Sequence, residues 1–314
     1  MGIKVKERKV LFIGIGSIAK RHIRNLKSIL GDKIEISAIR RTASRHIPRD
    51  VNDCIEHFYT LFEELEGNYD AIFITNPTAL HYDTLQKYGH MSDALFVEKP
   101  VFVTGEEDIT PWMNTTKKFY VAAPLRYSNV IQWLKQNFDF TTVHSMRVIS
   151  SSYLPDWRPG IDYRDTYSAH KNMGGGVSID LIHEWDYISY LLGFPTKMRS
   201  IISQKSNLEI DSDDIAVYIA EYPQMLVEVH LDYFGRKPIR QLEIISEEDT
   251  IIADLLEQRI TWLSSGKVLD LSEDRDSYQR KELLHFLDIV DGRVESDNTL
   301  EEACRVLRIA RGVE

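Results

Sequence analysis

Short apolar runs alternate with amphipathic stretches through the first third of the chain, and this alternation constrains the fold more than any other feature. The runs at residues 9–13 (KVLFI), 34–39 (IEISAI) and 70–75 (DAIFIT) are largely apolar at consecutive positions, as expected of strands that are covered on both faces. Two further runs stand at residues 95–97 and 120–123. Apolar residues between the first two runs recur at helical spacing. The repetition predicts a parallel sheet with right-handed helical crossovers.

The pattern changes after the first third of the chain, where longer alternating strands begin. These strands are expected over residues 143–152, 199–205, 215–221, 226–234 and 239–246. Their alternation of apolar and polar positions suits an antiparallel sheet with one wetter face. One strongly helical segment, residues 177–192, lies among them, and two helices are expected to close the chain at residues 278–290 and 300–310. The sequence therefore predicts an α/β fold with two domains, residues 1–123 and 124–314.

The composition argues against several classes of protein. The chain has 314 residues, enough for two domains, and its formal net charge of −10 disfavours a nucleic-acid or membrane-surface binder. The two cysteines, Cys54 and Cys304, lie too far apart in sequence to suggest a disulfide framework or a structural zinc site. No apolar run approaches the roughly 20 residues of a membrane span, and no signal peptide precedes the first glycines. We therefore expect a cytoplasmic protein without nucleic-acid or membrane partners.

The first glycines form a phosphate-binding pattern. Gly14 and Gly16 directly follow the first predicted strand, and Ala19 completes the spacing GxGxxA. In such a loop the first glycine allows a tight turn, the second lets a pyrophosphate approach the backbone, and the third small residue lets helix and sheet pack closely. Ser17 and Ile18 open the helix, whose free N–H groups and dipole attract phosphate. The pattern predicts a dinucleotide cofactor.

A basic run at the end of the second predicted strand bears on which dinucleotide is bound. Sites that prefer NAD usually carry Asp or Glu there, which binds the ribose 2′-hydroxyl. Here Arg40 and Arg41 follow the strand, and no acid stands beside them. Guanidinium groups suit a 2′-phosphate through charge-assisted, bidentate bonds. The sequence thus favours NADP(H), with NAD(H) as the alternative cofactor and a solvated basic loop as the alternative reading of the arginines.

Three further motifs follow the glycine segment VLFIGIGSIAKRHIRNL in order. They are ITNPTALHYDTL at residues 74–85, VEKPV at 97–101 and GGGVSIDLIHEWDY at 174–187. With these motifs the chain resembles the glucose–fructose oxidoreductase, inositol dehydrogenase and MocA family (Gfo/Idh/MocA). The resemblance implies an NADP-binding Rossmann domain over 1–123, and a substrate-binding and oligomerisation domain with a large, mostly antiparallel open sheet over 124–314. It places the active site between the domains, and we expect the closing helices to pack back on the first one.

The resemblance also implies a reaction and a set of site residues. Hydride would move between a nicotinamide and a sugar, nucleotide-sugar or polyol carbon, and the protein would form a homodimer or homotetramer. The residues that would bind the cofactor, besides the glycine loop and the two arginines, are Thr75, Asn76, Pro77, His81, Glu98, Lys99, Trp157, Arg158 and Tyr278. Those that would bind the substrate are Arg126, Tyr163, Arg164, Asp180 and His183. Ordinary packing is the alternative for Trp157 and Tyr278, and a structural ion pair is the alternative for Arg126.

The catalytic candidates are those that alcohol oxidation requires. A base must take the hydroxyl proton, and histidine suits this role because its ordinary pKa is about 6.5. His183 is the favoured base, and Lys99 would stabilise the developing alkoxide charge. Asp180 lies three residues before His183, so on one continuous helix the two side chains would share a face. Which acid orients the imidazole ring stays open among Asp180, Glu184 and Asp186.

Other chemistries fit the sequence less well than hydride transfer does. HEWDY lacks the second histidine of a HExxH metal motif, and no GxSxG elbow is present, so neither a metal site nor nucleophilic hydrolysis is expected. The loop over residues 153–171 is rich in aromatic and basic side chains. Such a loop fits a carbohydrate, and it fits a nucleotide sugar or acidic sugar slightly better than a neutral polyol. A non-catalytic NADP-binding regulator and an NAD-dependent glycosidase are the alternative functions.

Overall fold

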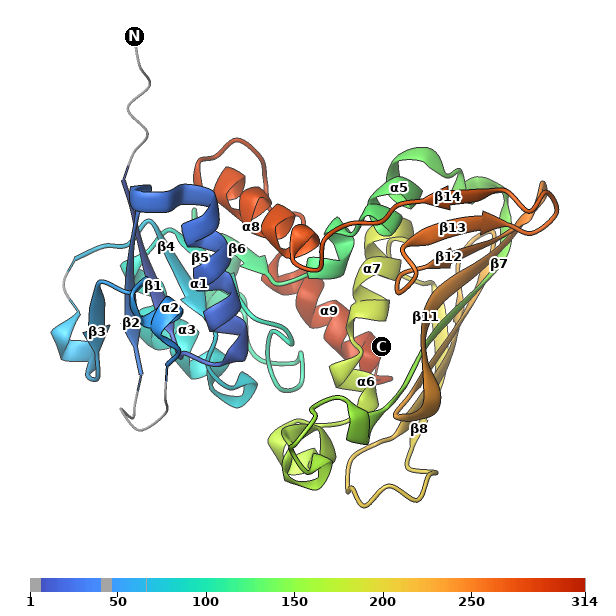
Figure 1. Cartoon of the computed structure of the whole chain (residues 1–314), viewed down its shortest axis with the longest axis horizontal. Coiled ribbons are helices and arrows are strands. Elements are labelled where there is room, and N and C mark those ends of the chain that lie inside the picture. The colour runs from blue at the N-terminus through green and yellow to red at the C-terminus, as the bar shows by residue number, and fades with distance from the viewer. Residues whose placement is uncertain (1–6, 41–46, 66, 314) are drawn as a thin grey trace, which may run out of the picture. The chain divides into compact units, whose positions relative to one another are not determined.

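The computed structural model describes residues 7–40, 47–65 and 67–313. The chain divides into two compact units. The first unit comprises Met1–Pro124 and Gln279–Cys304, and the second comprises Leu125–Tyr278 and Arg305–Glu314. The chain thus leaves the first unit, builds the second and returns. For this reason the first unit carries both the blue to green elements and the orange-red helix α8 in Figure 1.

The first unit is built on a six-stranded parallel sheet. Its strands are β1 (Arg8–Ile13), β2 (Ile34–Ile39), β3 (His57–Tyr59), β4 (Ala71–Ile74), β5 (Ala94–Val97) and β6 (Lys118–Val121). Their order is β3-β2-β1-β4-β5-β6, and all neighbours run parallel, which confirms the predicted parallel sheet. Within this parallel sheet the sequence pattern misses β3, because its three residues are largely exposed and form no apolar run. The strand order reverses between β1 and β4, and in such sheets ligands bind beyond the carboxyl ends of the strands at this point.

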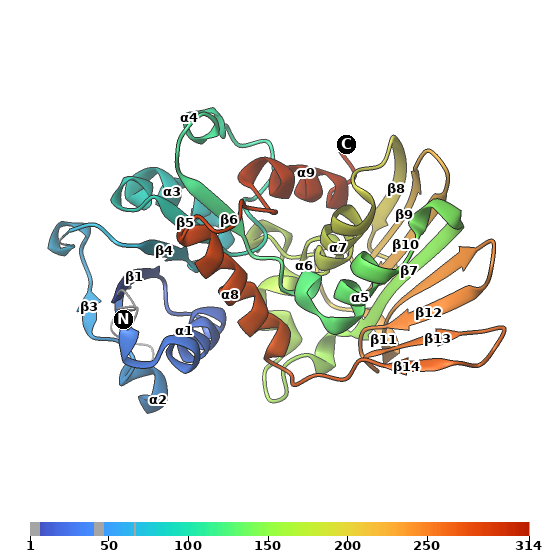
Figure 2. The same ribbon diagram turned by 90° about the horizontal axis from the view of Figure 1, so that it is seen from above.

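Aromatic packing joins the last part of the chain to this sheet. The α-helices among the described residues of the first 124 are α1 (Ser17–Leu30), α2 (Arg49–Asn52), α3 (His81–Tyr88) and α4 (Thr110–Met113). The helix α8 (Ser277–Val290) returns across the sheet (Figure 2). The Phe286 ring of α8 meets the rings of Phe73 and Phe96 edge-on, with centroids 5.4 and 5.2 Å apart. The helix α9 (Leu300–Ala310) begins in the first unit and ends in the second.

The second unit is an eight-stranded sheet with helices on one face. Its strands are β7 (Val143–Tyr153), β8 (Lys197–Ser203), β9 (Ile215–Glu221), β10 (Leu226–Asp232), β11 (Phe234–Ser246), β12 (Thr250–Asp254), β13 (Arg259–Trp262) and β14 (Val268–Asp270). The order is β14-β13-β12-β11-β7-β10-β9-β8, and only β7 and β10 pair in parallel. This confirms the predicted large, mostly antiparallel sheet. The helices α5 (Asn129–Asn137), α6 (Val177–Asp180) and α7 (His183–Leu192) cover one face, where Trp185 meets Tyr218.

The expected single helix over residues 177–192 is two helices. The helix α6 ends at Asp180, and α7 begins at His183. Between them Leu181 leaves the helical region, with φ −96° and ψ 29°. Around this joint Ile182 N–H donates to the carbonyl of Ile179, and Glu184 N–H donates to that of Leu181, so each bond spans three residues instead of four. The break means that the spacing of three between Asp180 and His183 does not place them on one helix face.

Within the described part of the chain, no helix has the length and apolar character that crossing a membrane requires.

Candidate active site

The glycine loop depends on a close approach between two strand ends of the first unit. Gly14 follows β1 with φ +90°, and a Cβ atom there would lie 2.8 Å from Cα of Asn76, which follows β4. The Gly14 N–H donates to the carbonyl of Ile39 at the end of β2 (3.0 Å). The Thr75 hydroxyl donates to the carbonyl of Gly14 (2.8 Å). Only glycine fits this position, because both the backbone conformation and the contact exclude a side chain.

The start of α1 fits the pyrophosphate of a dinucleotide. Gly16 and Ser17 are exposed, and a Cβ at Gly16 would meet nothing closer than the Thr75 carbonyl at 3.9 Å. No side chain caps the helix, and its first turn holds no acid, so its first N–H groups and dipole are available to an anion. Ile18 is half-buried, and Ala19 is fully buried, as close packing of helix on sheet requires. These residues therefore suit the cofactor that the sequence predicts.

Arg40 stands at the end of β2, where the ribose of a dinucleotide would be recognised. Its backbone N–H donates to the carbonyl of Tyr59 (3.1 Å), and its guanidinium carbon lies 5.6 Å from the centre of the Phe58 ring. Arg41 lies outside the described residues. The edge of the sheet thus orders the backbone of Arg40, and a partly exposed guanidinium group extends from it.

The motif ITNPTALHYDTL supports the glycine loop from β4 and α3. The Asn76 amide donates to the Thr84 hydroxyl (2.7 Å). The His81 ring is buried, with Nε2 2.9 Å from the carbonyl of Asn76 and Nδ1 3.1 Å from that of Val101. Burial lowers the pKa of His81. Pro77 is exposed at the start of the turn that leads into α3. The polar groups of this motif thus hold Asn76 against Gly14.

Glu98 has a partner that the sequence analysis did not identify. Its Oε1 atom lies 2.5 Å from Nε2 of His22, on α1, and both side chains are buried. The imidazole ring is enclosed by Phe96, edge-on at 5.1 Å, and by Phe73. The sequence offers one indication of this pair. His22 lies among the buried residues of α1, where a polar side chain needs a hydrogen-bond partner. The pair links α1 to the EKP motif.

Lys99 follows this buried pair directly. Its backbone N–H lies 3.3 Å from Oε2 of Glu98, and its peptide bond to Pro100 is cis. The side chain is partly exposed. The lysine therefore projects from a backbone that the buried Glu98 and His22 hold at the carboxyl end of β5.

Asp180 lies in a cluster of aromatic side chains in the second unit. The Tyr233 hydroxyl donates to Oδ2 of Asp180 (2.5 Å), and both residues are buried. Burial and the charge of Asp180 raise the pKa of Tyr233, and the same two causes raise that of Tyr167. The Trp157 ring meets Tyr233 edge-on at 5.2 Å, and the Arg158 guanidinium lies 5.4 Å from the centre of the Tyr167 ring. Trp157 and Arg158, predicted as cofactor contacts, thus lie in the cluster around Asp180.

The other two acids of the motif form ion pairs with arginines. Glu184 is fully buried and accepts from Nε of Arg240 (2.7 Å). Burial raises the pKa of Glu184, and the Arg240 charge opposes that shift. Asp186 accepts two bonds from the buried Arg126, from Nε (3.0 Å) and Nη2 (2.8 Å). Arg126 thus has a structural ion pair, and its predicted contact with the substrate stays a prediction.

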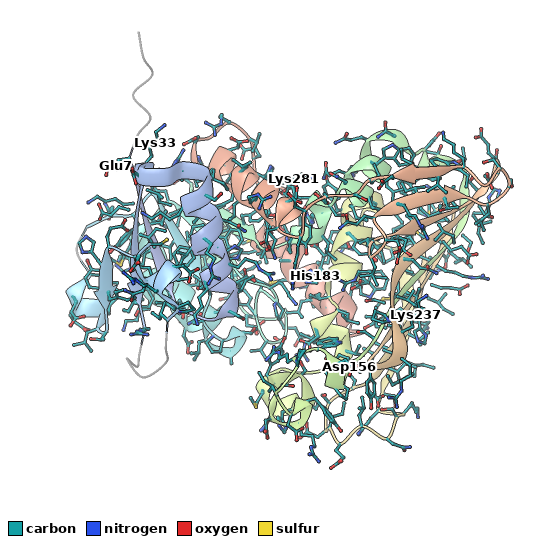
Figure 3. All side chains as sticks on the ribbon, in the orientation of Figure 1. Glu7, Lys33, Asp156, His183, Lys237 and Lys281 are labelled. Carbon is teal, nitrogen blue, oxygen red and sulfur yellow. The ribbon has the colours of Figure 1, made fainter. Side chains whose placement is uncertain are left out.

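His183, labelled in Figure 3, is the first residue of α7 and is partly exposed. The next five residues are buried. Tyr278, a further predicted cofactor contact, is half-buried at the start of α8. It contributes to raising the pKa of Arg240. Glu184 and Asp186 are neutralised by arginines, while Asp180 has a hydroxyl partner. Asp180 therefore differs from the other two acids of this motif in accepting a hydrogen bond from a tyrosine hydroxyl.

The glycines before α6 admit neighbouring backbone. A Cβ at Gly175 would collide with the carbonyls of Tyr167 and Ser168. At Gly176, with φ +135°, it would collide with the Asp213 carboxylate. Asp213 also accepts the N–H of Ser178 (2.9 Å) through that carboxylate. These glycines thus serve the packing of α6 against its own unit.

Two predicted substrate residues, Tyr163 and Arg164, lie in the loop that follows β7. Arg164 pairs with Asp162 (2.6 Å) and Glu209 (3.2 Å), and the Tyr163 hydroxyl accepts the N–H of Glu209 (3.2 Å). The Arg164 charge is thus neutralised. Over the residues that the structure describes, no group of three or more His, Cys, Asp and Glu side chains is arranged to hold a metal ion.

Each of the two units holds its own set of candidate residues, which we call the cofactor half and the substrate half. The cofactor half comprises the glycine loop, Arg40, the ITNP segment and Glu98–Lys99 in the first unit. The substrate half comprises Asp180, His183 and the aromatic cluster in the second unit.

Comparison with known proteins bears on the first unit and on the fold as a whole. Residues 8–118 match the model of an oxidoreductase family with an NAD-binding Rossmann fold, GFO_IDH_MocA. Residues 8–118 belong to this family. The chain is 24% identical to the uncharacterized oxidoreductase YrbE of Bacillus subtilis (strain 168), over 96% of this chain and 92% of that one. The resemblance to Gfo/Idh/MocA oxidoreductases, and with it the assignment to nicotinamide-dependent oxidoreductases, is confirmed.

Solved structures of this kind share the whole fold. A UDP-N-acetylglucosamine 3-dehydrogenase from Acidithiobacillus ferrooxidans superposes with a TM-score of 0.78 at 17% identity, and covers 98% of this chain and 96% of its own. A myo-inositol 2-dehydrogenase from Lactobacillus plantarum gives 0.76 at 18% identity, with the same two coverages. At such identities the likeness establishes the two-part fold alone and leaves the substrate to be argued separately.

The close approach of Gly14 and Asn76 predicts the effect of a single methyl group. Gly14→Ala should lower the free energy of unfolding by about 1–3 kcal/mol and abolish tight NAD(P)H binding, because backbone strain and overpacking act together. Urea unfolding and a fluorescence titration with NAD(P)H measure both effects. The matched control is Gly31→Ala, where φ is +59° but a Cβ would meet nothing within 4 Å. Equal losses of cofactor affinity in the two variants would contradict the steric argument.

Proposed function

We propose that the protein is an NADP(H)-dependent oxidoreductase acting on a hydroxyl-bearing carbon of a sugar or nucleotide sugar. The observation that carries this proposal is the open, uncapped start of α1 beside Gly14, at the switch point of a parallel sheet. When bound, the nicotinamide cofactor accepts or donates a hydride. The residues of this chain supply the binding and the proton chemistry.

His183 and Lys99 carry the acid–base chemistry in this proposal. His183 takes the hydroxyl proton in the oxidative direction and returns it in the reductive direction. Lys99 donates to the same oxygen and stabilises its developing negative charge. Its backbone is held by the buried Glu98 and His22, which supports its assignment as a fixed donor. Asp180, which accepts a hydrogen bond from the Tyr233 hydroxyl, is the acid that we assign to orienting the imidazole ring.

A carbohydrate substrate is supported by two observations. The cluster around Asp180 contains Trp157, Tyr167 and Tyr233, and aromatic side chains of this kind are suited to stacking on a sugar ring. Two of the structural neighbours are named as a UDP-N-acetylglucosamine 3-dehydrogenase and a myo-inositol 2-dehydrogenase. A panel of sugars, nucleotide sugars and polyols with NADP(H) and NAD(H) tests the proposal. If the enzyme binds the cofactor but transfers hydride to or from none of these compounds, the proposal is refuted.

Removing the lysine tests the proton chemistry. Lys99→Met should lower kcat by about 10²–10³-fold, the usual cost of losing one donor to a developing oxyanion. Cofactor affinity should change little, because the backbone of the motif is kept. Steady-state kinetics and a cofactor titration measure the two quantities. Lys33→Met, an exposed lysine in the same unit, is the control, and a kcat that Lys99→Met leaves unchanged would remove Lys99 from the mechanism.

Reversing a charge tests the preference for NADP. Arg40→Asp should shift the ratio of kcat/KM for NADP to that for NAD by at least about 10-fold towards NAD. The variant loses a charge-assisted bond to the 2′-phosphate and places an acid beside it. Arg49→Asp, an exposed arginine on α2, controls for the change in net charge. The same ratio in Arg40→Asp as in the wild type would exclude Arg40 from cofactor recognition.

We also propose that two copies of the chain pair through the outer face of the eight-stranded sheet. Ile201, Ile219 and Leu226, on the neighbouring strands β8, β9 and β10, are 70%, 54% and 50% exposed. Their apolar surface on adjacent strands is of the kind that a second copy covers.

A charge placed on this face tests the pairing. Ile219→Lys should halve the mass measured by sedimentation, because a buried unpaired ammonium group disfavours association. Leu256→Lys, a similarly exposed apolar position outside these three strands, is the control. A wild-type chain that sediments as a monomer would overturn this proposal.

A further inference from the structure

A cavity of about 380 Å³ in the second unit has no role in the function proposed above. It is lined by Tyr153 at the end of β7, Tyr163 in the following loop and Phe234 at the start of β11. Lys205, in the loop after β8, and Arg236, on β11, contribute the charged part of its wall. Its size is within the range of small-molecule sites. Three aromatic rings and two cations therefore surround one open space.

The two cations are available to a ligand. Within the described part of the chain, neither Lys205 Nζ nor the Arg236 guanidinium forms an ion pair within 4.0 Å. The Arg236 guanidinium carbon lies 3.8 Å from the centre of the Tyr153 ring, so a cation–π contact orients it. Arg164, by contrast, is neutralised by two acids, Asp162 and Glu209. Glu209 directly follows Leu208, which lines the cavity. The wall of the cavity is therefore positively charged.

The loop that carries Lys205 is ordered by hydrogen bonds to a buried carboxylate. Asp214 is fully buried and accepts the N–H groups of Lys205 (2.7 Å) and Ser206 (2.8 Å). It also accepts the Ser206 hydroxyl (2.6 Å), and that oxygen accepts the N–H of Leu208. These bonds order the backbone of the loop before any ligand arrives, which reduces the entropic cost of binding.

We propose that this cavity binds the nucleoside diphosphate group of a nucleotide-linked substrate. The diphosphate would pair with Arg236 and Lys205, since guanidinium and ammonium groups are the usual partners of phosphate. The base would stack on an aromatic wall, which every nucleobase can do. Phe234 directly follows Tyr233, whose hydroxyl holds Asp180, so one short segment of chain serves both the cavity and the substrate half. The inference rests on the proposed function, and selects nucleotide sugars from its substrate classes.

Calorimetry on the full chain tests the inference. UDP and GDP are titrated, with pyrophosphate for comparison, while saturating NADP⁺ occupies the glycine loop. The tighter of the two nucleotides should bind at least about 10-fold more tightly than pyrophosphate. Arg236→Gln and Lys205→Gln should each weaken its binding by about 10-fold, the loss expected for one charge-assisted bond. Both residues are exposed, so the variants should fold as the wild type does.

Arg259→Gln provides the matched control, because Arg259 is an exposed arginine on β13, away from the cavity lining. No nucleotide binding by the wild type overturns the inference, and so does equal weakening by Arg259→Gln and Arg236→Gln. Nucleotide affinity no higher than that of pyrophosphate overturns it as well. Nucleotide binding that depends on Arg236, without hydride transfer to any carbohydrate, refutes the proposed function alone. Hydride transfer with a neutral sugar, unchanged in Arg236→Gln, together with no nucleotide binding, refutes the cavity alone.

Discussion

The contact of Gly14 with Asn76 is the constraint on which the cofactor half depends. It brings the ends of β1 and β4 together at the one point where the order of the parallel sheet reverses. Hydrogen bonds support this contact on both sides. The Thr75 hydroxyl donates to the carbonyl of Gly14, and Thr84 and His81 bond to Asn76. The helix α1 begins just beyond it, with no cap of its own. The anion-binding end of the helix is therefore placed by packing that involves no ligand.

The substrate half follows a different principle, in which each acid is defined by its partner. Asp180, Glu184 and Asp186 stand within seven residues of one another, and all three are buried. Arginines neutralise Glu184 and Asp186, while Asp180 meets the hydroxyl of Tyr233. Asp180 therefore differs from the other two in its partner, a tyrosine hydroxyl. Three similar residues thus have two different roles, and their environment decides between them.

Much of the fold could be predicted because it is encoded in local pattern. Consecutive apolar positions indicate the buried parallel strands. Alternation of apolar and polar positions indicates the antiparallel strands that have one solvent-exposed face. The short strand β3 escapes this reasoning, because an exposed edge strand of three residues needs no apolar run. The break between α6 and α7 escapes it too. The residues from 177 to 192 keep a helical pattern, and only the backbone of Leu181 departs from it.

The sequence by itself determined the chemistry that is available: a glycine loop, a lysine after a strand, and a histidine among acids and aromatic residues. These features depend on neighbours in the chain, so spacing reveals them. Only the tertiary structure decided which of these groups act together, as with His22 and Glu98, 76 residues apart, or Asp180 and Tyr233, 53 apart. Likewise, only folding showed that Arg164 is neutralised while Lys205 and Arg236 line a cavity. The physical reason is that the charge state and accessibility of a polar group depend on its spatial partners, which the chain brings together only on folding.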